Sequence, residues 1–354
     1  MDLANTFIDI SPVPQDDGPF PICAIQYPER FTQVMGFFRA CLLTEELSDR
    51  TLALTSEVID TNPANYTAWH FRRKCLTALG KPLAAEIEFT SETGGENPKN
   101  YQIWFHRRAC LEQLGGTEKD AREEVRRKRR AERGTQESEE QARARNKRER
   151  GTRCSLLVTA PSKRRERPRP AHTIPPPPQL EYVSLVIADD SKNYHAWAHR
   201  QYIIQTFSLW STEVAFVKKA ISADIRNNSA WNQLWFATHG DHPDASGAFD
   251  IEATLDYALE IAGSDVYNES PFLFILGLLK EQWKKGSLVG TDKVQAAMEA
   301  VKDKKSAHVH SMLVDIAVQK KENSTAVALC NELITDVDMV RLKFWAWKLS
   351  TITQ

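Results

Sequence analysis

A short aromatic phrase recurs along this chain at a nearly constant spacing. Three copies read Asn-Tyr-x-x-Trp with an arginine three residues after the tryptophan, and their tryptophans are Trp69, Trp104 and Trp197. A looser copy centres on Trp231, and a fifth carries Phe272 in place of tryptophan. The steps between the tryptophans are 35, 93 and 34 residues, so the long step equals one repeat of 35 plus 58 further residues. Repeats of this length are typical of stacked units that bury their apolar faces only against their neighbours.

Each repeat is predicted to contain two helices joined by a turn. Apolar residues recur at helical spacing over 47–60 and 211–224, and a short polar turn then leads to the phrase. The asparagine of the phrase is a good N-cap for the second helix. Tryptophan and the arginine three residues later share one helix face, so we expect buried tryptophans and arginines that make contacts between repeats. Strand signals are almost absent, and the predicted fold is therefore all-α: an α-α superhelix (solenoid) of helix-turn-helix repeats.

A basic segment interrupts the repeats. Residues 117–180 hold 19 Lys+Arg and 10 Asp+Glu, a net charge of +9, whereas the other 290 residues hold 27 and 37, a net charge of −10. Dense charge and low hydrophobicity predict a disordered, solvated loop, with a charged helix over 119–150 as an option. Nucleic-acid binding or nuclear targeting is a weaker alternative because stacking aromatic residues are absent, and a retained intron or gene-model error is a third. We expect no nucleic-acid partner.

The predicted organisation follows from these boundaries. It comprises an N-terminal extension over 1–24, opening helices with two repeats over 25–116, the insert over 117–180, and three repeats with C-terminal helices over 181–354.

Cysteine and histidine usage argues against a metal site in this chain. The six cysteines lie far apart without a C-x-x-C pair, which favours reduced thiols in the cytosol. The nine histidines form only two close pairs, neither of which lies beside suitable acids or cysteines. The longest apolar stretch, 271–279, is far shorter than the ~20 residues that span a bilayer. No signal peptide or C-terminal lipidation motif is evident. We expect a soluble, cytoplasmic protein without stable membrane insertion and with no cofactor of its own.

The phrase Pro-x-Asn-Tyr-x-x-Trp-x-x-Arg-Arg resembles the repeat of protein prenyltransferase α subunits, and in particular the α subunit shared by protein farnesyltransferase and type I geranylgeranyltransferase. The resemblance covers roughly residues 25–116 and 181–285. It implies a heterodimer in which helical pairs wrap a separate β subunit. The complex would transfer a farnesyl or geranylgeranyl group from its diphosphate to the cysteine of a C-terminal CaaX box, on substrates such as small GTPases. The resemblance places the zinc ligands on β, with magnesium as a further candidate ion of the complex.

Diphosphate stabilisation is the chemistry that this chain itself can supply. A positioned cation lowers the barrier to departure of a leaving group that becomes negative, and lysine suits a phosphate oxygen as a compact point charge. Lys99 and Lys192 both precede Asn-Tyr, and residue chemistry alone does not choose between them, since either could be a solvated turn lysine. The family lysine lies in Pro-Lys-Asn-Tyr-Gln, which matches Lys99. The resemblance therefore implies that Lys99 is the catalytic cation.

Other site residues are implied by the same motifs. Gln102 matches a glutamine that donates to the CaaX carboxylate, and Tyr101 is expected to line the cleft. Residues expected near the substrates or β on the flanking turns are Ala64, Tyr66, Asn193, Tyr194 and His195. Packing against β is the rival interpretation for each. The fourth and fifth repeats depart from the pattern at Asn228, Leu234 and Phe272, and we expect them to pack without contacting substrate.

Two alternative functions remain at this point. One is a non-catalytic helical-repeat scaffold that binds peptides, which would not need a diphosphate cation beside a carboxylate contact. The other is the α subunit of Rab geranylgeranyltransferase, a poorer match because that subunit typically carries additional domains.

Overall fold

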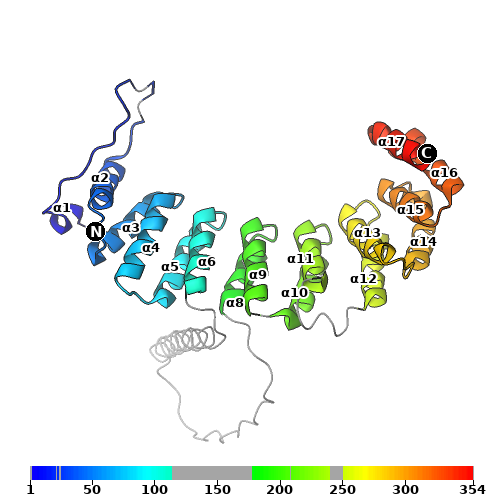
Figure 1. The fold of residues 1–354 in the computed structure, drawn as a ribbon, viewed down its shortest axis with the longest axis horizontal. Coiled ribbons are helices and arrows are strands. Elements are labelled where there is room, and N and C mark those ends of the chain that lie inside the picture. Colours follow the sequence, from blue (N-terminus) through cyan, green and yellow to red (C-terminus); the bar gives the residue numbers. More distant parts are fainter. Residues whose placement is uncertain are drawn as a thin grey trace, which may run out of the picture. The chain divides into compact units, whose positions relative to one another are not determined.

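The structure is a computed structural model that describes residues 2–20, 22–23, 25–113, 178–207, 209–239 and 250–353. The chain divides into two compact units, Met1–Phe207 and Ser208–Gln354. Within the described residues every regular element is a helix, and consecutive helices run side by side as pairs (Figure 1). The predicted fold class, an all-α stack of helix-turn-helix repeats, is confirmed. The predictions for 117–177, including the charged helix over 119–150, fall outside the described residues.

Over its described residues, the first unit contains two opening helices and three helix pairs. The opening helices are α1 (Leu3–Thr6) and α2 (Glu29–Leu43). The pairs are α3 (Asp49–Thr61) with α4 (Tyr66–Ala78), α5 (Leu83–Glu96) with α6 (Tyr101–Gln113), and α8 (Pro178–Asp189) with α9 (Tyr194–Phe207). Helix α8 begins at Pro178, so its first three residues fall within the range predicted for the insert.

The second unit continues the pairing and ends in C-terminal helices. Its first elements are η1 (Trp210–Thr212), α10 (Glu213–Ala223), α11 (Asn228–His239), α12 (Ile251–Ser264) and α13 (Glu269–Lys284). They are followed by α14 (Thr291–Glu299), η3 (Lys302–Lys304), α15 (Ala307–Gln319) and α16 (Asn323–Glu332). The π-helical turn η4 (Leu333–Val337), η5 (Met339–Arg341) and α17 (Leu342–Thr353) complete it.

The asparagine of the repeated phrase caps one helix and binds the preceding repeat at the same time. In Asn193 the Oδ1 atom accepts the Ala196 N–H at 3.1 Å, as an N-cap should. Its Nδ2 atom donates to the Pro98 carbonyl at 3.0 Å. That carbonyl also accepts Trp104 Nε1 at 2.8 Å, so one backbone oxygen joins two repeats.

The same arrangement recurs in the second unit. The Ile225 carbonyl accepts Trp231 Nε1 at 2.9 Å and Asn268 Nδ2 at 2.7 Å. The asparagine and the tryptophan therefore each satisfy a turn carbonyl that would otherwise lack an intrahelical partner. The four motif tryptophans are buried, which confirms the predicted core. Removing roughly 150–250 Å² of each ring from water contributes about 4–6 kcal/mol.

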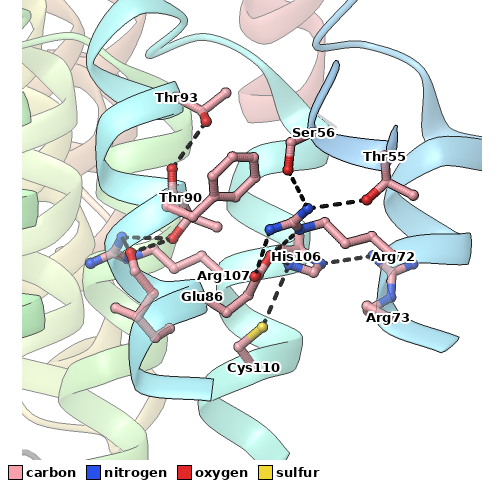
Figure 2. Close-up of polar contacts among 12 residues, drawn as sticks. Thr55, Ser56, Arg72, Arg73, Glu86, Thr90, Thr93, His106, Arg107 and Cys110 are labelled. Carbon is pink, nitrogen blue, oxygen red and sulfur yellow. Dashed lines mark hydrogen bonds and ion pairs between the residues drawn. The ribbon is translucent and has the colours of Figure 1, made fainter. Parts of the chain in front are cut away.

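The motif arginines lie inside the stack rather than on its surface. Figure 2 shows Arg72 between Glu86 on one side and Thr55 and Ser56 on the other. Arg72 Nε and Nη2 donate to the two Glu86 oxygens at 2.5 and 2.9 Å, and Nη1 donates to Ser56 Oγ at 2.7 Å. Arg107 repeats this geometry one pair later, donating from Nε to Gln179 at 2.8 Å and from Nη1 to Thr90 at 3.0 Å. The predicted role of these arginines in contacts between repeats is confirmed.

His106 completes the network around Glu86. Its Nε2 atom lies 2.7 Å from Glu86 Oε1, and its Nδ1 atom lies 3.3 Å from Arg73 Nη1. Burial lowers the pKa of His106 despite the hydrogen bond to Glu86, so the ring is neutral near pH 7. Because Arg73 can only donate, Nδ1 is the acceptor and Nε2–H donates to the carboxylate. Burial alone would raise the pKa of Glu86, but the bonds from His106 and Arg72 lower it, and the carboxylate is ionised.

Candidate functional site

Two adjacent turns carry six of the eight residues that the sequence selects. The α5–α6 turn bears Lys99, Tyr101 and Gln102, and the α8–α9 turn bears Asn193, Tyr194 and His195. Three contacts hold these turns together. They are Asn193 Nδ2 to the Pro98 carbonyl at 3.0 Å, Lys99 Nζ to Asp190 Oδ2 at 3.0 Å, and Tyr101 against His195 with ring centroids 5.9 Å apart. The two turns therefore form one surface.

The Lys99 ammonium group lies on this surface and remains largely open to solvent. Its side chain is 76% exposed, whereas that of its partner Asp190 is 30% exposed. The second carboxylate oxygen of Asp190 accepts the Lys192 N–H at 3.1 Å. The bond from Lys99, followed by the bond from the Lys192 backbone, lowers the pKa of Asp190. An ammonium has three N–H donors, so Lys99 can hold one acidic partner and still donate to another anion.

Exposed tyrosines flank the lysine. Tyr66, Tyr101 and Tyr194 are 71%, 62% and 75% exposed, and each is the first residue of its helix. A large aromatic ring that is left exposed at the same position of three repeats is typical of an interaction surface. Lys99 lies two residues before Tyr101, just outside the N-terminus of α6, where the backbone N–H groups of the helix also favour a negative ligand.

The remaining predicted residues differ in their exposure. Ala64 lies with Tyr66 on the α3–α4 turn, one repeat earlier, and is exposed. Gln102 is half-buried in the first turn of α6, where its backbone N–H donates to Asn100 Oδ1 at 2.9 Å. His195 is also half-buried, and desolvation lowers its pKa, so the imidazole is neutral near pH 7. These three positions can present neutral polar or small groups to a ligand.

Asn193 stands apart from the other site residues. Its side chain is only 2% exposed, and both ends of its amide are used, one by Pro98 and one by the start of α9. Contact with a substrate stays a prediction from the family resemblance for this residue, and its burial favours a structural role.

Asp190 was not selected from the sequence, although its position carries a signal. It precedes the motif asparagine by three residues, and Asp224 and Asp265 occupy the same register in the following repeats. In each turn the carboxylate accepts the N–H two residues later, at 3.1, 2.9 and 3.1 Å. In the second unit Asp265 also pairs with Arg226, whose Nε lies 2.8 Å from Oδ2. The aspartate therefore recurs as a link between successive turns.

The repeats that depart from the pattern pack as expected. Leu234 occupies the register of the motif arginine and is buried, and Phe272 is buried where the other repeats have tryptophan. That these repeats do not contact substrate stays a prediction.

The described residues contain neither a cluster of metal ligands nor a membrane-spanning helix. No group of three or more His, Cys, Asp or Glu side chains that could hold a metal ion occurs among them. No helix of the described part of the chain is long and apolar enough to cross a membrane.

Comparison with known proteins gives consistent results at three levels. The model of the protein prenyltransferase alpha subunit repeat matches residues 48–79, 83–114, 179–207 and 210–239, and the fifth copy at Phe272 lies outside these ranges.

Two curated relatives match over nearly their whole length. The protein farnesyltransferase/geranylgeranyltransferase type-1 subunit alpha of Dictyostelium discoideum is 32% identical over 353 residues, covering 98% of this chain and 92% of the relative. The subunit of the same name from Pisum sativum is 33% identical, with coverage of 99% and 95%. Among solved structures, Candida albicans protein geranylgeranyltransferase-I complexed with GGPP matches with a TM-score of 0.73 at 23% identity, covering 98% of both chains.

Proposed function

Because the chain belongs to the family of protein farnesyltransferase/geranylgeranyltransferase type-1 α subunits, we propose that it works as one half of a heterodimer with a separate β subunit. The complex transfers a farnesyl or geranylgeranyl group from its diphosphate to the cysteine thiol of a C-terminal CaaX sequence. The thiol gives up its proton to solvent, the sulfur forms the new bond to the isoprenoid carbon, and diphosphate leaves with the electron pair of the carbon–oxygen bond that breaks. The relatives carry the type-1 name, which does not favour the Rab-specific alternative.

Zinc is implied by the family. The described residues do not offer a donor set that fits it. We propose that the zinc ligands belong to the β subunit.

The exposed Lys99 ammonium is the group of this chain that we propose takes part in the reaction. It lies at the N-terminal end of α6, on the surface formed by two turns and flanked by aromatic rings. Negative charge accumulates on the diphosphate oxygens as the bond to carbon breaks, and a cation already in place stabilises that charge more than the ground state. We assign Lys99 to this role because its ammonium is a compact point charge with N–H donors left for phosphate oxygens after its contact with Asp190.

The neighbouring residues are assigned to peptide and partner contacts. Gln102 lies three residues after Lys99, in the first turn of α6, and its amide can donate to the carboxylate that ends a CaaX peptide. Tyr66, Tyr101 and Tyr194 present exposed rings that can pack against the β subunit or the substrates. Their placement at the first residue of each helix gives the partner a row of similar contacts.

Lys99→Ala, co-expressed with the β subunit, tests the assignment. Single-turnover transfer from farnesyl or geranylgeranyl diphosphate to a CaaX peptide should slow by about 10²-fold, the usual effect of removing one electrostatic stabiliser. Lys81→Ala is a matched control, since Lys81 is a partly exposed lysine that pairs with Asp49 and lies in the connection between α4 and α5, outside the proposed site. Its transfer rate should equal that of the unmodified complex. Near-normal transfer by an intact Lys99→Ala heterodimer would show that Lys99 has no such role.

A further inference from the structure

The carboxylate of Asp190 is divided between two partners. One oxygen accepts the Lys192 backbone N–H at 3.1 Å, inside its own turn, and the other lies 3.0 Å from Lys99 Nζ in the neighbouring turn. The first bond fixes the orientation of the carboxylate. The second oxygen is therefore held at one place beside Lys99 rather than sampling several rotamers.

The backbone that carries Lys99 is held to the same turn. Asn193 Nδ2 donates to the carbonyl of Pro98, the residue just before Lys99. Asn193 is itself fixed as the cap of α9, to which the Ala196 N–H donates at 3.1 Å. The backbone beside Lys99 and the carboxylate of Asp190 are therefore both held in place, and only the flexible side-chain stem of the lysine lies between them.

A lysine on a flexible four-carbon stem samples many positions when it is exposed. Lys99 is 76% exposed, so apolar packing does little to restrict its stem, and Asp190 provides a fixed acceptor at its tip. One N–H of the ammonium points to Asp190, and two remain for another anion. An acceptor that restricts the ammonium without consuming all its donors is what preorganised stabilisation of a leaving group requires.

We propose that Asp190 is a positioning residue that holds the Lys99 ammonium ready for the isoprenoid diphosphate, an inference that rests on the proposed role of Lys99. Asp190 acts through Lys99 and does not itself bind substrate.

The repeats provide the substitution that separates the charge of Asp190 from its role in the turn. Asn62 occupies the same register in the first repeat, and its Oδ1 accepts the Ala64 N–H at 3.1 Å, as Asp190 does for Lys192. Asp190→Asn therefore keeps the turn bond and removes the negative charge that faces Lys99. Asp265→Asn is the matched control, because Asp265 has the same turn bond and its cationic partner is Arg226, a residue of the second unit, instead of Lys99.

The test measures single-turnover transfer by heterodimers that carry these variants, with farnesyl or geranylgeranyl diphosphate and a CaaX peptide. Asp190→Asn should slow transfer by about three- to five-fold, the upper range for an exposed ion pair. Asp265→Asn should leave the rate unchanged. In a Lys99→Ala background Asp190→Asn should have no further effect, because the residue acts only through the lysine.

Three results would overturn the inference. Normal or faster transfer by Asp190→Asn, with slow transfer by Lys99→Ala, would leave the role of Lys99 standing and refute positioning by Asp190. If Asp190→Asn lowered the transfer rate equally with and without Lys99, the aspartate would act through the structure of the turn and not through the lysine. Normal transfer by Lys99→Ala would refute the catalytic assignment, and the inference would fall with it.

Discussion

Replacing Glu86 by alanine should destabilise the helix pairs around it more than any surface substitution on the same helix. Glu86 is buried and accepts two bonds from Arg72, at 2.5 and 2.9 Å, and one from His106 at 2.7 Å. After Glu86→Ala, Arg72 keeps its bonds to Thr55 and Ser56 but has no anion beside it. Breaking one side of a buried ion pair in this way costs about 3–5 kcal/mol, because the remaining charge stays desolvated.

Replacing Glu86 by glutamine should destabilise the helix pairs less than replacing it by alanine. Gln179 occupies the equivalent register one repeat later, fourteen residues before its motif asparagine as Glu86 is before Asn100. There Arg107 Nε donates to Gln179 Oε1 at 2.8 Å, so an uncharged acceptor is compatible with a buried arginine in this fold. Glu86→Gln keeps one acceptor oxygen, which can still serve Arg72 Nε and His106, and loses the charge and the bond from Arg72 Nη2, a loss of roughly 2 kcal/mol.

Amide hydrogen exchange on the full chain in its heterodimer measures these differences where they arise. The free energy of protection of peptides from α4, α5 and α6 should fall by the amounts given for Glu86→Ala and Glu86→Gln. Peptides from α12 and α13 serve as internal references. Glu88→Ala, at an exposed position on the same helix, should change protection by less than about 0.5 kcal/mol. The reasoning is refuted if Glu86→Ala lowers protection by less than 1 kcal/mol, or if Glu86→Gln is as damaging as Glu86→Ala.

Two further predictions concern buried titratable groups. Burial, together with the positive charges of Arg107 and Arg108, lowers the pKa of His199 to about 3. The folded state therefore binds one proton fewer than the unfolded state below pH ~6.5, and stability should fall by about 2 kcal/mol from pH 6.5 to 5. His199→Phe, which places the residue found at Phe71 in the same register, should remove this part of the pH dependence in urea unfolding curves; an unchanged pH slope would contradict it. Among the described cysteines, Cys23 should be alkylated first by iodoacetamide under native conditions, because it is exposed, whereas Cys110 is buried and burial raises its pKa to about 12. Mass spectrometry of the labelled peptides reports the order, and early labelling of Cys110 would contradict the burial.

Much of the fold could be predicted from the register of one repeated phrase. The N-cap role of the asparagines, the burial of the tryptophans and the inward direction of the arginines all follow from helical periodicity, and the structure confirms them. The helices predicted over 47–60 and 211–224 are observed as Asp49–Thr61 and Glu213–Ala223. These features were accessible because each depends on neighbours only a few residues away in the chain.

The partners of the buried groups were not accessible in this way. Glu86 and Gln179 each lie in the repeat that follows the repeat of the arginine they bind. One is an acid and the other an amide, so the sequence around either residue shows no recurring pattern. The start of α8 was hidden for a related reason. Proline suits the first turn of a helix, where an N–H is not needed, but Pro178 ends a run of four prolines that reads as part of the insert.

Lys99 and the exposed tyrosines occupy positions whose side chains the packing of the repeats does not require. In each described turn the motif asparagine, the tryptophan and the acid or amide three residues before the asparagine are committed to bonds within or between repeats. The residues immediately before and after the asparagine are exposed, and neither position is fixed: Ala64, Lys99 and Arg226 stand before it, and tyrosine in three repeats but Asn228 in the fourth stand after it. Changes at exposed positions usually alter stability by less than about 0.5 kcal/mol. A repeat can therefore acquire a cation or an aromatic contact there without weakening the stack. Lys99 and Tyr101 occupy these two positions, so the cation that we propose for catalysis lies where the stack does not depend on the side chain.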